Sequence, residues 1–526
     1  MTRQIVDAAT LERPLKLEAD AVVVGTGAGG AVAAEILAQA GLRVVMLEEG
    51  GYQTARDFTL RELDANTELY YDSGSRTTRD GAITILQGRT VGGSTTVNWT
   101  SSFRAPDETL SHWRSAHGVE GLGSADLAPW WRRLEQRLNV APWAVPPNPN
   151  NAALARGCAR LGYAHAVIPR NVRGCRNLGY CGMGCPVNAK RGMLVTTVPG
   201  ALDAGAVLVT HARADRVLLR GDKAVGVEAL ALDARSVHPT GHTITVAARF
   251  VVAAGGAINT PGLLLRSQLP DPHQRLGKRT FIHPVNLSTA ILPETVDGFS
   301  GAPQSVYSDQ FLWRDGVTGR VGYKLEAAPL YPMLTLSLMG RMGRELLQRF
   351  GGRYRNGQVL IALLRDGFHE QSQGGQVLLR GDGSAVLDYP LTDYLWEGLF
   401  DAYLHMAEVQ FAAGATEVLP FHLDAKPYGS LAEAKAGIAA LPAKPVRGAI
   451  FTAHLMGGCG MGNDPKTSVI TGAGRHHQLE GLAVIDGSMF PTSLGVNPQM
   501  TIYGIASRNA TQLARDLGGK VKEAAA

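Results

Sequence analysis

The chain has 526 residues, more than one hydrophobic core usually supports, so we expect about two to four domains or subdomains. Its 51 Lys and Arg exceed its 46 Asp and Glu by only 5 and form no basic block, which argues against a nucleic acid partner. No apolar run is long enough to span a membrane, and residues 1–20 do not resemble a secretory signal. Because five cysteines are also too few for a disulfide scaffold, we expect a cytoplasmic protein.

The N-terminal part of the chain predicts a βαβ unit. Residues 20–26 form an apolar run typical of a buried strand, residues 31–40 follow with a helical pattern, and residues 42–48 form a second apolar run. Strands that are joined through a helix run parallel. A similar pattern, an apolar run that leads into glycine, occurs at residues 249–267 and 481–490. We therefore predict an α/β fold with a parallel sheet.

A second domain is predicted inside the first. Residues 285–449 alternate apolar and polar stretches, such as "QVLLRGDGSAVLDYPL", which favours an antiparallel sheet. We therefore divide the chain into a discontinuous nucleotide-binding domain of residues 17–110, 200–284 and 450–526, and an inserted α+β substrate domain of residues 285–449. Residues 111–199 form a cap or linker region that contains a cysteine-rich loop.

The turn after the first strand has the glycine spacing of a dinucleotide-binding loop. Gly25 permits a tight turn, Gly27 lets the backbone approach a pyrophosphate, and Gly30 lets the helix pack on the strand. Glu48 ends the next strand, where its carboxylate can accept both ribose hydroxyls. The turn therefore predicts a dinucleotide site, although this stretch alone does not distinguish NAD from FAD.

Three cysteines lie close together in "GCRNLGYCGMGCPVNAKRG", residues 174–192. Cys175, Cys181 and Cys185 are separated by five and then three residues, among glycines that would let the chain wrap closely. Three thiolates on one loop suggest a metal, but structural zinc usually takes a fourth protein ligand and none is nearby. An iron-sulfur cluster, a disulfide and free thiols all stay open.

Three segments resemble the glucose-methanol-choline (GMC) oxidoreductase family. They are "QGRTVGGSTTVNWTSSFR" at residues 87–104, "HLMGGCGMGNDPKTSVI" at residues 454–470, and residues 481–510. The resemblance covers essentially the whole chain. Because members of this family bind FAD and oxidise alcohols, it implies FAD as the cofactor, a Rossmann-type FAD-binding domain, and an inserted substrate domain built on an antiparallel sheet.

The resemblance also implies further cofactor contacts. Residues along the pyrophosphate and the flavin edge are Arg89, Gly92, Gly93, Ser94 and Asn98, with Ala214 near the adenine and Asp486 near the ribityl chain. Backbone amides at a glycine pair can face a flat ring where a Cβ would collide. A long helix predicted after Pro498 would direct its N-terminus at negative charge on a reduced flavin.

His454 and Asn497 are the predicted catalytic pair. An imidazole can be neutral near physiological pH and accept the hydroxyl proton of an alcohol, while the hydride passes to the flavin. Asn497 matches the family's second position, and its amide can orient the substrate oxygen. Leu455 follows the base where many family members have Pro. We interpret His283 as a residue of the fold, and residues 476–477 as a solvated turn.

We predict an FAD-dependent alcohol dehydrogenase or oxidase. Residues 324–350 mix Leu and Met with few charges and either line an apolar pocket or form an amphipathic strand and helix; the first alternative implies a lipophilic primary or secondary alcohol. The electron acceptor is oxygen, a quinone or a redox protein.

Two alternatives within the family and one outside it stay open. The three-cysteine spacing resembles the flavin subunits of membrane-associated sugar dehydrogenases, which implies an iron-sulfur relay. A redox-silent flavin-binding lyase would use His454 only as an acid or base. A nicotinamide enzyme that uses the first turn alone would be colourless when purified.

Overall fold

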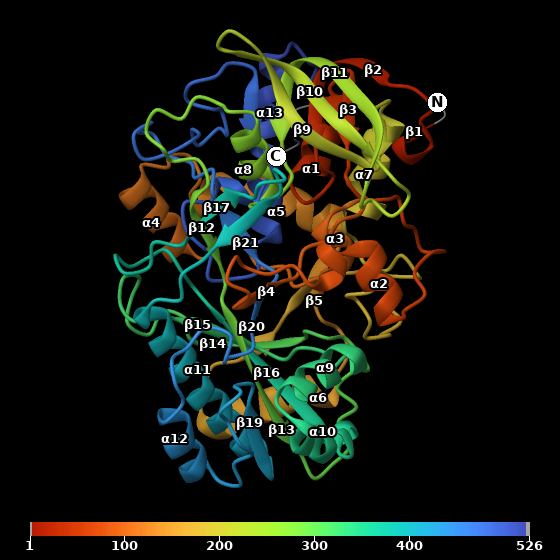
Figure 1. The fold of residues 1–526 in the computed structure, drawn as a ribbon. Helices are drawn as coiled ribbons and strands as arrows, with labels where there is room; N and C mark the ends of the chain where they lie inside the picture. Colours follow the sequence, from red (N-terminus) through yellow and green to blue (C-terminus); the bar gives the residue numbers. More distant parts are fainter. Residues whose placement is uncertain (1–2, 522–526) are drawn as a thin grey trace.

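A mixed eight-stranded sheet forms the upper half of the molecule (Figure 1). The computed structural model describes residues 3–521. Strand β2 pairs in parallel with β3 and β11, while β11, β10 and β9 form an antiparallel run. In order across the sheet, the strands are β1 (Gln4–Asp7), β8 (Val207–Thr210), β3 (Val44–Leu47), β2 (Leu15–Val24), β11 (Pro239–Ala253), β10 (Lys223–Leu232) and β9 (Ala212–Arg220), with β22 (Leu482–Val484) beside β11.

The predicted βαβ unit is confirmed as β2, α1 (Gly30–Gln39) and β3. Val22 and Val23 are fully buried because the end of β2 lies in the middle of the sheet. Strand β2 begins earlier than predicted, since Leu15 and the residues after it pair with the long strand β11. The strand and helix predicted within residues 249–267 are confirmed as the end of β11 followed by α8 (Asn259–Arg266).

A second eight-stranded sheet forms the lower half of the molecule (Figure 1). Its central strands pair antiparallel, as the alternation within residues 285–449 predicts. In order, the strands are β4 (Ile83–Ile85), β20 (Ile450–Thr452), β13 (Val285–Ile291), β16 (Gly357–Leu364), β15 (Tyr323–Glu326), β14 (Val306–Phe311) and β6 (Ala166–Val167), with β19 (Glu417–Pro420) beside β13. Helices α11 (Asp393–Ala412) and α6 (Pro149–Leu161) pack on this sheet, and α12 (Leu431–Ala439) packs on α11.

A small four-stranded sheet forms a third unit. It consists of β18 (Ala385–Asp388), β17 (Gly375–Leu379), β12 (Lys278–Ile282) and β21 (Leu455–Gly457). The predicted hairpin "QVLLRGDGSAVLDYPL" is confirmed as β17 and β18, but it belongs to this sheet and not to the large antiparallel one. Strands β12 and β21 pair Ile282 with Leu455, which places His283 and His454 side by side at the strand ends.

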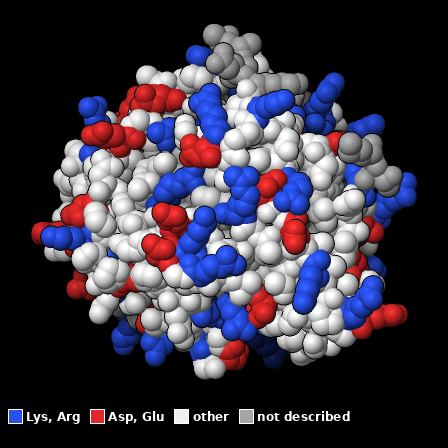
Figure 2. Space-filling view, turned by 90° about the horizontal axis from the view of Figure 1, so that it is seen from above, with Lys and Arg blue, Asp and Glu red and all other residues white. Residues whose placement is uncertain are grey.

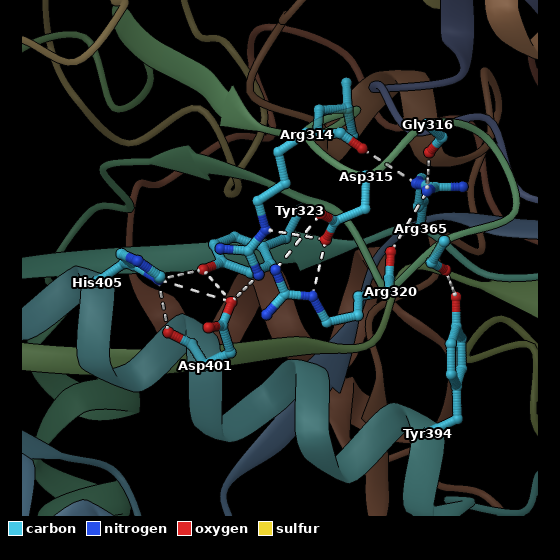
Figure 3. Close-up of polar contacts among 11 residues, drawn as sticks. Arg314, Asp315, Gly316, Arg320, Tyr323, Arg365, Tyr394, Asp401 and His405 are labelled. Carbon is cyan, nitrogen blue, oxygen red and sulfur yellow. Dashed lines mark hydrogen bonds and ion pairs between the residues drawn. The ribbon is translucent and has the colours of Figure 1, made fainter.

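A polar network holds the segment between β14 and β15 against α11 (Figure 3). The carboxylate of Asp401 accepts hydrogen bonds from Arg314 and from the hydroxyl of Tyr323, and that hydroxyl also bonds to His405. Arg365 donates to two carbonyl oxygens of the same segment, that of Leu312 at 3.0 Å and that of Gly316 at 2.8 Å. The network therefore holds the segment through several of its residues.

Helices α5 (Ser124–Leu138) and α6 lie in the predicted cap or linker region, and α4 (Asp107–His117) crosses its predicted N-terminal boundary at residue 111. Helix α5 packs against α13 (Gln499–Asp516), which lies beside the nucleotide-binding sheet. Three short strands of the second sheet, β4, β6 and β20, lie outside residues 285–449. The predicted domain boundaries stay a prediction, and the second sheet extends beyond them.

Candidate functional site

A cavity of about 890 Å³ brings together segments that lie far apart in the sequence. Its walls come from the turn between β2 and α1, the segment before α3 (Ser94–Val97), the beginning of β9, and the residues before β21 and α13. Among the predicted site residues, those on the wall are Gly25, Gly27, Glu48, Arg89, Gly93, Ser94, Asn98, Ala214, His454, Asp486, Asn497 and Pro498. Gly30 and Gly92 are not on the wall and lie behind it.

The first glycine turn has the geometry of a phosphate-binding loop. Gly25 has φ +97°, and a Cβ there would lie 2.4 Å from the carbonyl oxygen of Ala254. A Cβ on Gly30 would lie 2.0 Å from the carbonyl oxygen of Gly25, so only glycine lets α1 pack on this turn. By contrast, a Cβ on Gly27 would come no closer than 3.9 Å to other residues and would occupy the cavity.

The second glycine turn meets the first. Gly92 and Gly93 have φ +89° and +54°, and a Cβ on Gly93 would lie 2.9 Å from the Cα of Gly27. The backbone N–H of Gly92 donates to the hydroxyl of Thr26 at 3.0 Å. The two bare backbones therefore form a narrow cradle on one wall of the cavity.

Glu48 is already engaged by the first turn. Its carboxylate accepts hydrogen bonds from the backbone N–H and the hydroxyl of Thr26 on one oxygen, and from the N–H of Gly50 on the other. Burial raises the pKa of this carboxyl group to about 7. Because an ionised carboxylate has about four acceptor positions, one of them stays free for a ribose hydroxyl, fewer than the sequence suggests.

Protein donors occupy all four acceptor positions of the Asp486 carboxylate. Each of its carboxylate oxygens accepts two hydrogen bonds, one pair from Ser488 and the other from Gly256 and Thr260. Burial raises the pKa of the Asp486 carboxyl group, and these donors oppose that rise. Asp486 therefore lies on the cavity wall as predicted, but its carboxylate ties the surrounding segments together.

The remaining predicted cofactor residues lie on several other elements. Arg89 donates to the carbonyl oxygen of Ser236 at 2.8 Å, and the Asn98 amide donates to Gln499 at 2.8 Å. Ala214 lies on β9, and the hydroxyl of Ser94 accepts from the N–H of Gly88. Helix α13 begins at Gln499, directly after Pro498, as the sequence predicts.

Asn497 lies on the cavity wall and has a buried side-chain oxygen without a hydrogen-bond partner in the described part of the chain. The side chain is only 5% exposed, and its Oδ1 has no hydrogen-bond partner among the described residues. Its amide lies beside the buried carboxyl group of Glu326 and lowers the pKa of that group, as does the neighbouring ammonium of Lys324. No described residue uses Oδ1 of Asn497, which stays an acceptor.

His454 contacts a second histidine that sequence analysis assigned only to the fold. Its Nδ1 lies 3.0 Å from Nδ1 of His283, whose Nε2 accepts the backbone N–H of Gly495 at 3.0 Å. Burial, together with the charge of Lys324, lowers the pKa of His454 to about 4. His283 is fully buried, and its sequence surroundings give no signal of this contact, which depends on the pairing of β12 with β21.

The structure also bears on two other expectations from the sequence, the effect of Leu455 after His454 and the solvated turn at residues 476–477. Leu455 opens β21 opposite Ile282, so a strand pair holds the backbone beside His454 even without Pro. The predicted solvated turn at residues 476–477 is wrong for His476, which is only 6% exposed, because that segment forms bridges with Ile470 and Ala483.

Comparison with known proteins identifies the family. The family descriptions of GMC oxidoreductases match residues 66–285 and 371–506. The chain belongs to the GMC oxidoreductase family. It is therefore an FAD-dependent alcohol oxidoreductase, in agreement with the fold class and the family predicted from the sequence.

Three relatives illustrate how this GMC oxidoreductase compares. It is 31% identical to the long-chain-alcohol oxidase FAO4B of Arabidopsis thaliana, over 96% of this chain and 69% of the relative. It is 35% identical to an uncharacterised GMC-type oxidoreductase of Mycobacterium tuberculosis, over 97% of this chain and 78% of the relative. The solved formate oxidase of Aspergillus oryzae shares the fold, with a TM-score of 0.69 and 14% identity over 96% of this chain and all of that one.

The geometry of the GMC oxidoreductase cavity fits FAD. The paired turns at Gly27 and Gly93 leave backbone without side chains where a diphosphate or a flat ring would lie. Ala214 and Glu48 lie on the wall of the same cavity as Asn497 and His454. An extended dinucleotide can thus contact both glycine turns and end beside the two polar side chains.

The three-cysteine loop does not support an iron-sulfur cluster. Within residues 3–521, no group of three or more His, Cys, Asp or Glu side chains is arranged to hold a metal ion, and all five cysteines are free thiols. The loop is instead held by protein contacts: Lys190 donates to the carbonyl oxygen of Cys181, and Arg170 lies 3.7 Å from its sulfur. The metal prediction for Cys175, Cys181 and Cys185 is therefore not supported.

The stretch of residues 324–350 does not line this cavity. It forms β15, α9 (Pro332–Arg341) and α10 (Arg344–Gly351), and none of its described residues lies on the cavity wall. The second alternative, an amphipathic strand and helix, thus describes its place in the fold. Apolar residues on the wall come from other strands and segments, among them Trp99, Val285, Ile361, Leu363 and Phe451.

Proposed function

We propose that this GMC oxidoreductase oxidises a lipophilic primary or secondary alcohol to the aldehyde or ketone. The observation that carries the proposal is that His454 and Asn497, which are 43 positions apart, lie on the wall of the same cavity as the two glycine turns. A titratable imidazole and an unpaired amide oxygen thus share a space with the cofactor cradle.

Residues of both glycine turns would hold FAD. The backbone N–H of Gly27 and the bare backbone at Gly93 would line the diphosphate, the free acceptor position of Glu48 would receive one ribose hydroxyl, and the N-terminus of α13 would stabilise negative charge on the reduced ring. Bound FAD supplies the acceptor for the hydride that leaves the carbinol carbon.

His454 and Asn497 would handle the substrate oxygen. The hydroxyl group would lie between the two side chains, where the amide of Asn497 orients the oxygen and the imidazole of His454 takes the one hydroxyl proton. Because burial disfavours the imidazolium form, His454 is neutral in the resting enzyme and can act as a base.

A lipophilic substrate is supported by the wall of the cavity. Trp99, Val285, Ile361, Leu363 and Phe451 contribute apolar surface, which favours an alkyl or alicyclic chain over a sugar. The similarity to a long-chain-alcohol oxidase points the same way. Oxygen, a quinone and a redox protein all stay candidates for the electron acceptor.

An anaerobic alcohol panel tests this function. The purified protein is mixed without oxygen with long-chain primary alcohols, alicyclic secondary alcohols and sugars, and flavin absorbance is recorded. We expect the lipophilic alcohols to bleach the flavin and the sugars to leave it yellow. A flavin that stays oxidised with every alcohol would contradict the proposal and favour a redox-silent lyase. Readmission of oxygen, or addition of a quinone, then identifies the acceptor that restores the colour.

A further inference from the structure

The contact between His283 and His454 has a defined proton arrangement. The two Nδ1 atoms lie 3.0 Å apart, and the rings are nearly perpendicular at 88°. At this distance one nitrogen donates and the other accepts, so a proton must lie on one Nδ1 and not on the other. The neighbours of the pair decide which.

Gly495 settles the tautomer of His283. Its backbone N–H can only donate, and it points at Nε2 of His283 at 3.0 Å. Nε2 of His283 is therefore an acceptor without a proton. Because a neutral imidazole carries a single proton, that proton lies on Nδ1 and is donated to Nδ1 of His454.

The same reasoning then applies to His454. Its Nδ1 uses the lone pair to accept from His283, so the single proton of the neutral ring lies on Nε2. His454 lies on the cavity wall, and Nε2 has no hydrogen-bond partner within the described part of the chain. The nitrogen that is left for the substrate oxygen is thus an N–H donor.

The Gly495 donor is held firmly in place. The backbone N–H of Ser493 donates to the carbonyl oxygen of Asp366 at 3.0 Å, and the N–H of Asp366 donates back to the hydroxyl of Ser493 at 2.7 Å. A Cβ on Gly495 would lie 3.4 Å from the ring of Trp313, on which the guanidinium of Arg365 stacks at 4.5 Å. Arg365 is itself bound to the loop between β14 and β15 (Figure 3).

The charged surroundings of the pair oppose a second proton. The titratable groups that act on His454 are His283 and Lys324, and Lys324 in turn lies beside Glu326. Burial, the other histidine and Lys324 lower the pKa of His283 as well. A proton on Nδ1 of His454 would also face the N–H of His283, so the imidazolium form loses a hydrogen bond.

We propose that His283 is a positioning residue that holds His454 in the tautomer with the proton on Nε2. This inference rests on the alcohol oxidation proposed above. In the resting enzyme the substrate oxygen then accepts from Nε2 of His454, and the hydroxyl group donates to Oδ1 of Asn497.

The base form of His454 requires a proton exchange within the pair. The Nδ1 proton of His283 passes to Nδ1 of His454, the Nε2 proton of His454 is released to solvent water, and Nε2 of His283 takes up a proton from solvent water, so each ring keeps one proton. This exchange breaks the contact with the N–H of Gly495. His283 thus sets the free-energy cost of making Nε2 of His454 an acceptor, and with it the pH dependence of the base.

Nitrogen NMR of the FAD-loaded enzyme tests the tautomer directly. The full-length protein is labelled with ¹⁵N-histidine and measured without substrate, and the variants His454→Gln and His283→Gln assign the signals. We expect Nδ1 of His454 to have the shift of an unprotonated nitrogen and Nε2 that of a protonated one. A protonated Nδ1 on His454 would overturn the proposal. Because no substrate is present, failure of the alcohol panel leaves this readout unchanged.

The pH profile of flavin reduction provides the second readout. In His283→Gln, the side-chain oxygen can accept the Nδ1 proton of a His454 imidazolium, so we expect the apparent pKa of the profile to rise by at least about one unit. The control is His422→Gln, which removes a buried histidine that bonds to Pro442 outside the cavity. A profile that is the same in His283→Gln, with FAD retained, would contradict the proposal. If that variant loses FAD, the NMR of the wild-type protein still decides.

Discussion

His454 and Asn497 owe their chemistry to buried groups that contact them from other strands. His283 contacts the imidazole from the end of β12, and Glu326 on β15 contacts the amide. The sequence predicts a functional role for both residues because the family pattern marks them. It does not identify His283 or Glu326, since each acts through a contact between positions more than a hundred residues apart.

The low pKa of His454 predicts a flat pH profile. A pKa lowered to about 4 means that the ring stays neutral at every higher pH, so the fraction of neutral imidazole does not change with pH in that range. We expect the rate of anaerobic flavin reduction by an alcohol to stay constant from about pH 5.5 to about pH 8 and to fall only as the pH drops towards 4. A decline with a midpoint near 6.5, the ordinary value of histidine, would show that His454 is not the buried group described here.

Glu48 predicts a second outcome at the residue scale. Glu48→Ala removes the acceptor for the ribose hydroxyl and leaves the N–H groups of Thr26 and Gly50 without their partner. We expect FAD to bind about tenfold more weakly, the size of one charge-assisted hydrogen bond. The ratio of flavin to protein after dialysis measures the change. An exposed carboxylate, Glu12, provides the control as Glu12→Ala, and equal flavin retention in the two variants would argue against the ribose contact.

At the scale of elements, two features could be predicted from the sequence and one could not. The unit of β2, α1 and β3 follows from apolar runs around a glycine turn, and α13 follows from Pro498 before a helical pattern. The period-two pattern of β17 and β18 predicts a hairpin. It does not say which sheet the hairpin joins, because an alternating strand can pair with any partner of matching length.

Gly30 tests how tightly α1 packs on the turn. A Cβ there would lie 2.0 Å from a backbone oxygen that cannot move without opening the turn, so Gly30→Ala should destabilise the protein by about 1–3 kcal/mol and release FAD. Gly340→Ala is the matched control, because Gly340 lies in α9 with no atom within 4 Å of its Cβ position. Thermal unfolding and flavin content are measured on both, and equal behaviour would refute the packing argument.

At the scale of the whole molecule, the cavity lies where two large sheets and a small one meet. The sequence predicts two domains but not the three short strands β4, β6 and β20 that extend the second sheet, because strands of two or three residues leave no periodic pattern. The three-cysteine prediction failed for a related reason, since spacing alone does not say whether thiols converge.

The charged residues on the surface are distributed as the small net charge of the sequence predicts. Figure 2 shows Lys and Arg interspersed with Asp and Glu on one face of the molecule. Ion pairs between exposed side chains also occur, such as that of Arg3 with Asp203. No described helix is both long enough and apolar enough to cross a membrane. The cytoplasmic location stays a prediction.

The most direct test of the central claim is rapid anaerobic mixing of FAD-loaded His454→Ala with a long-chain primary alcohol. The account predicts that the variant keeps its FAD but that the alcohol reduces the flavin at least about a hundredfold more slowly than in the wild type. His165→Ala, which removes an exposed histidine, should match the wild type. A near-normal rate of flavin reduction in His454→Ala would contradict the account, because the proton would then be taken by another group.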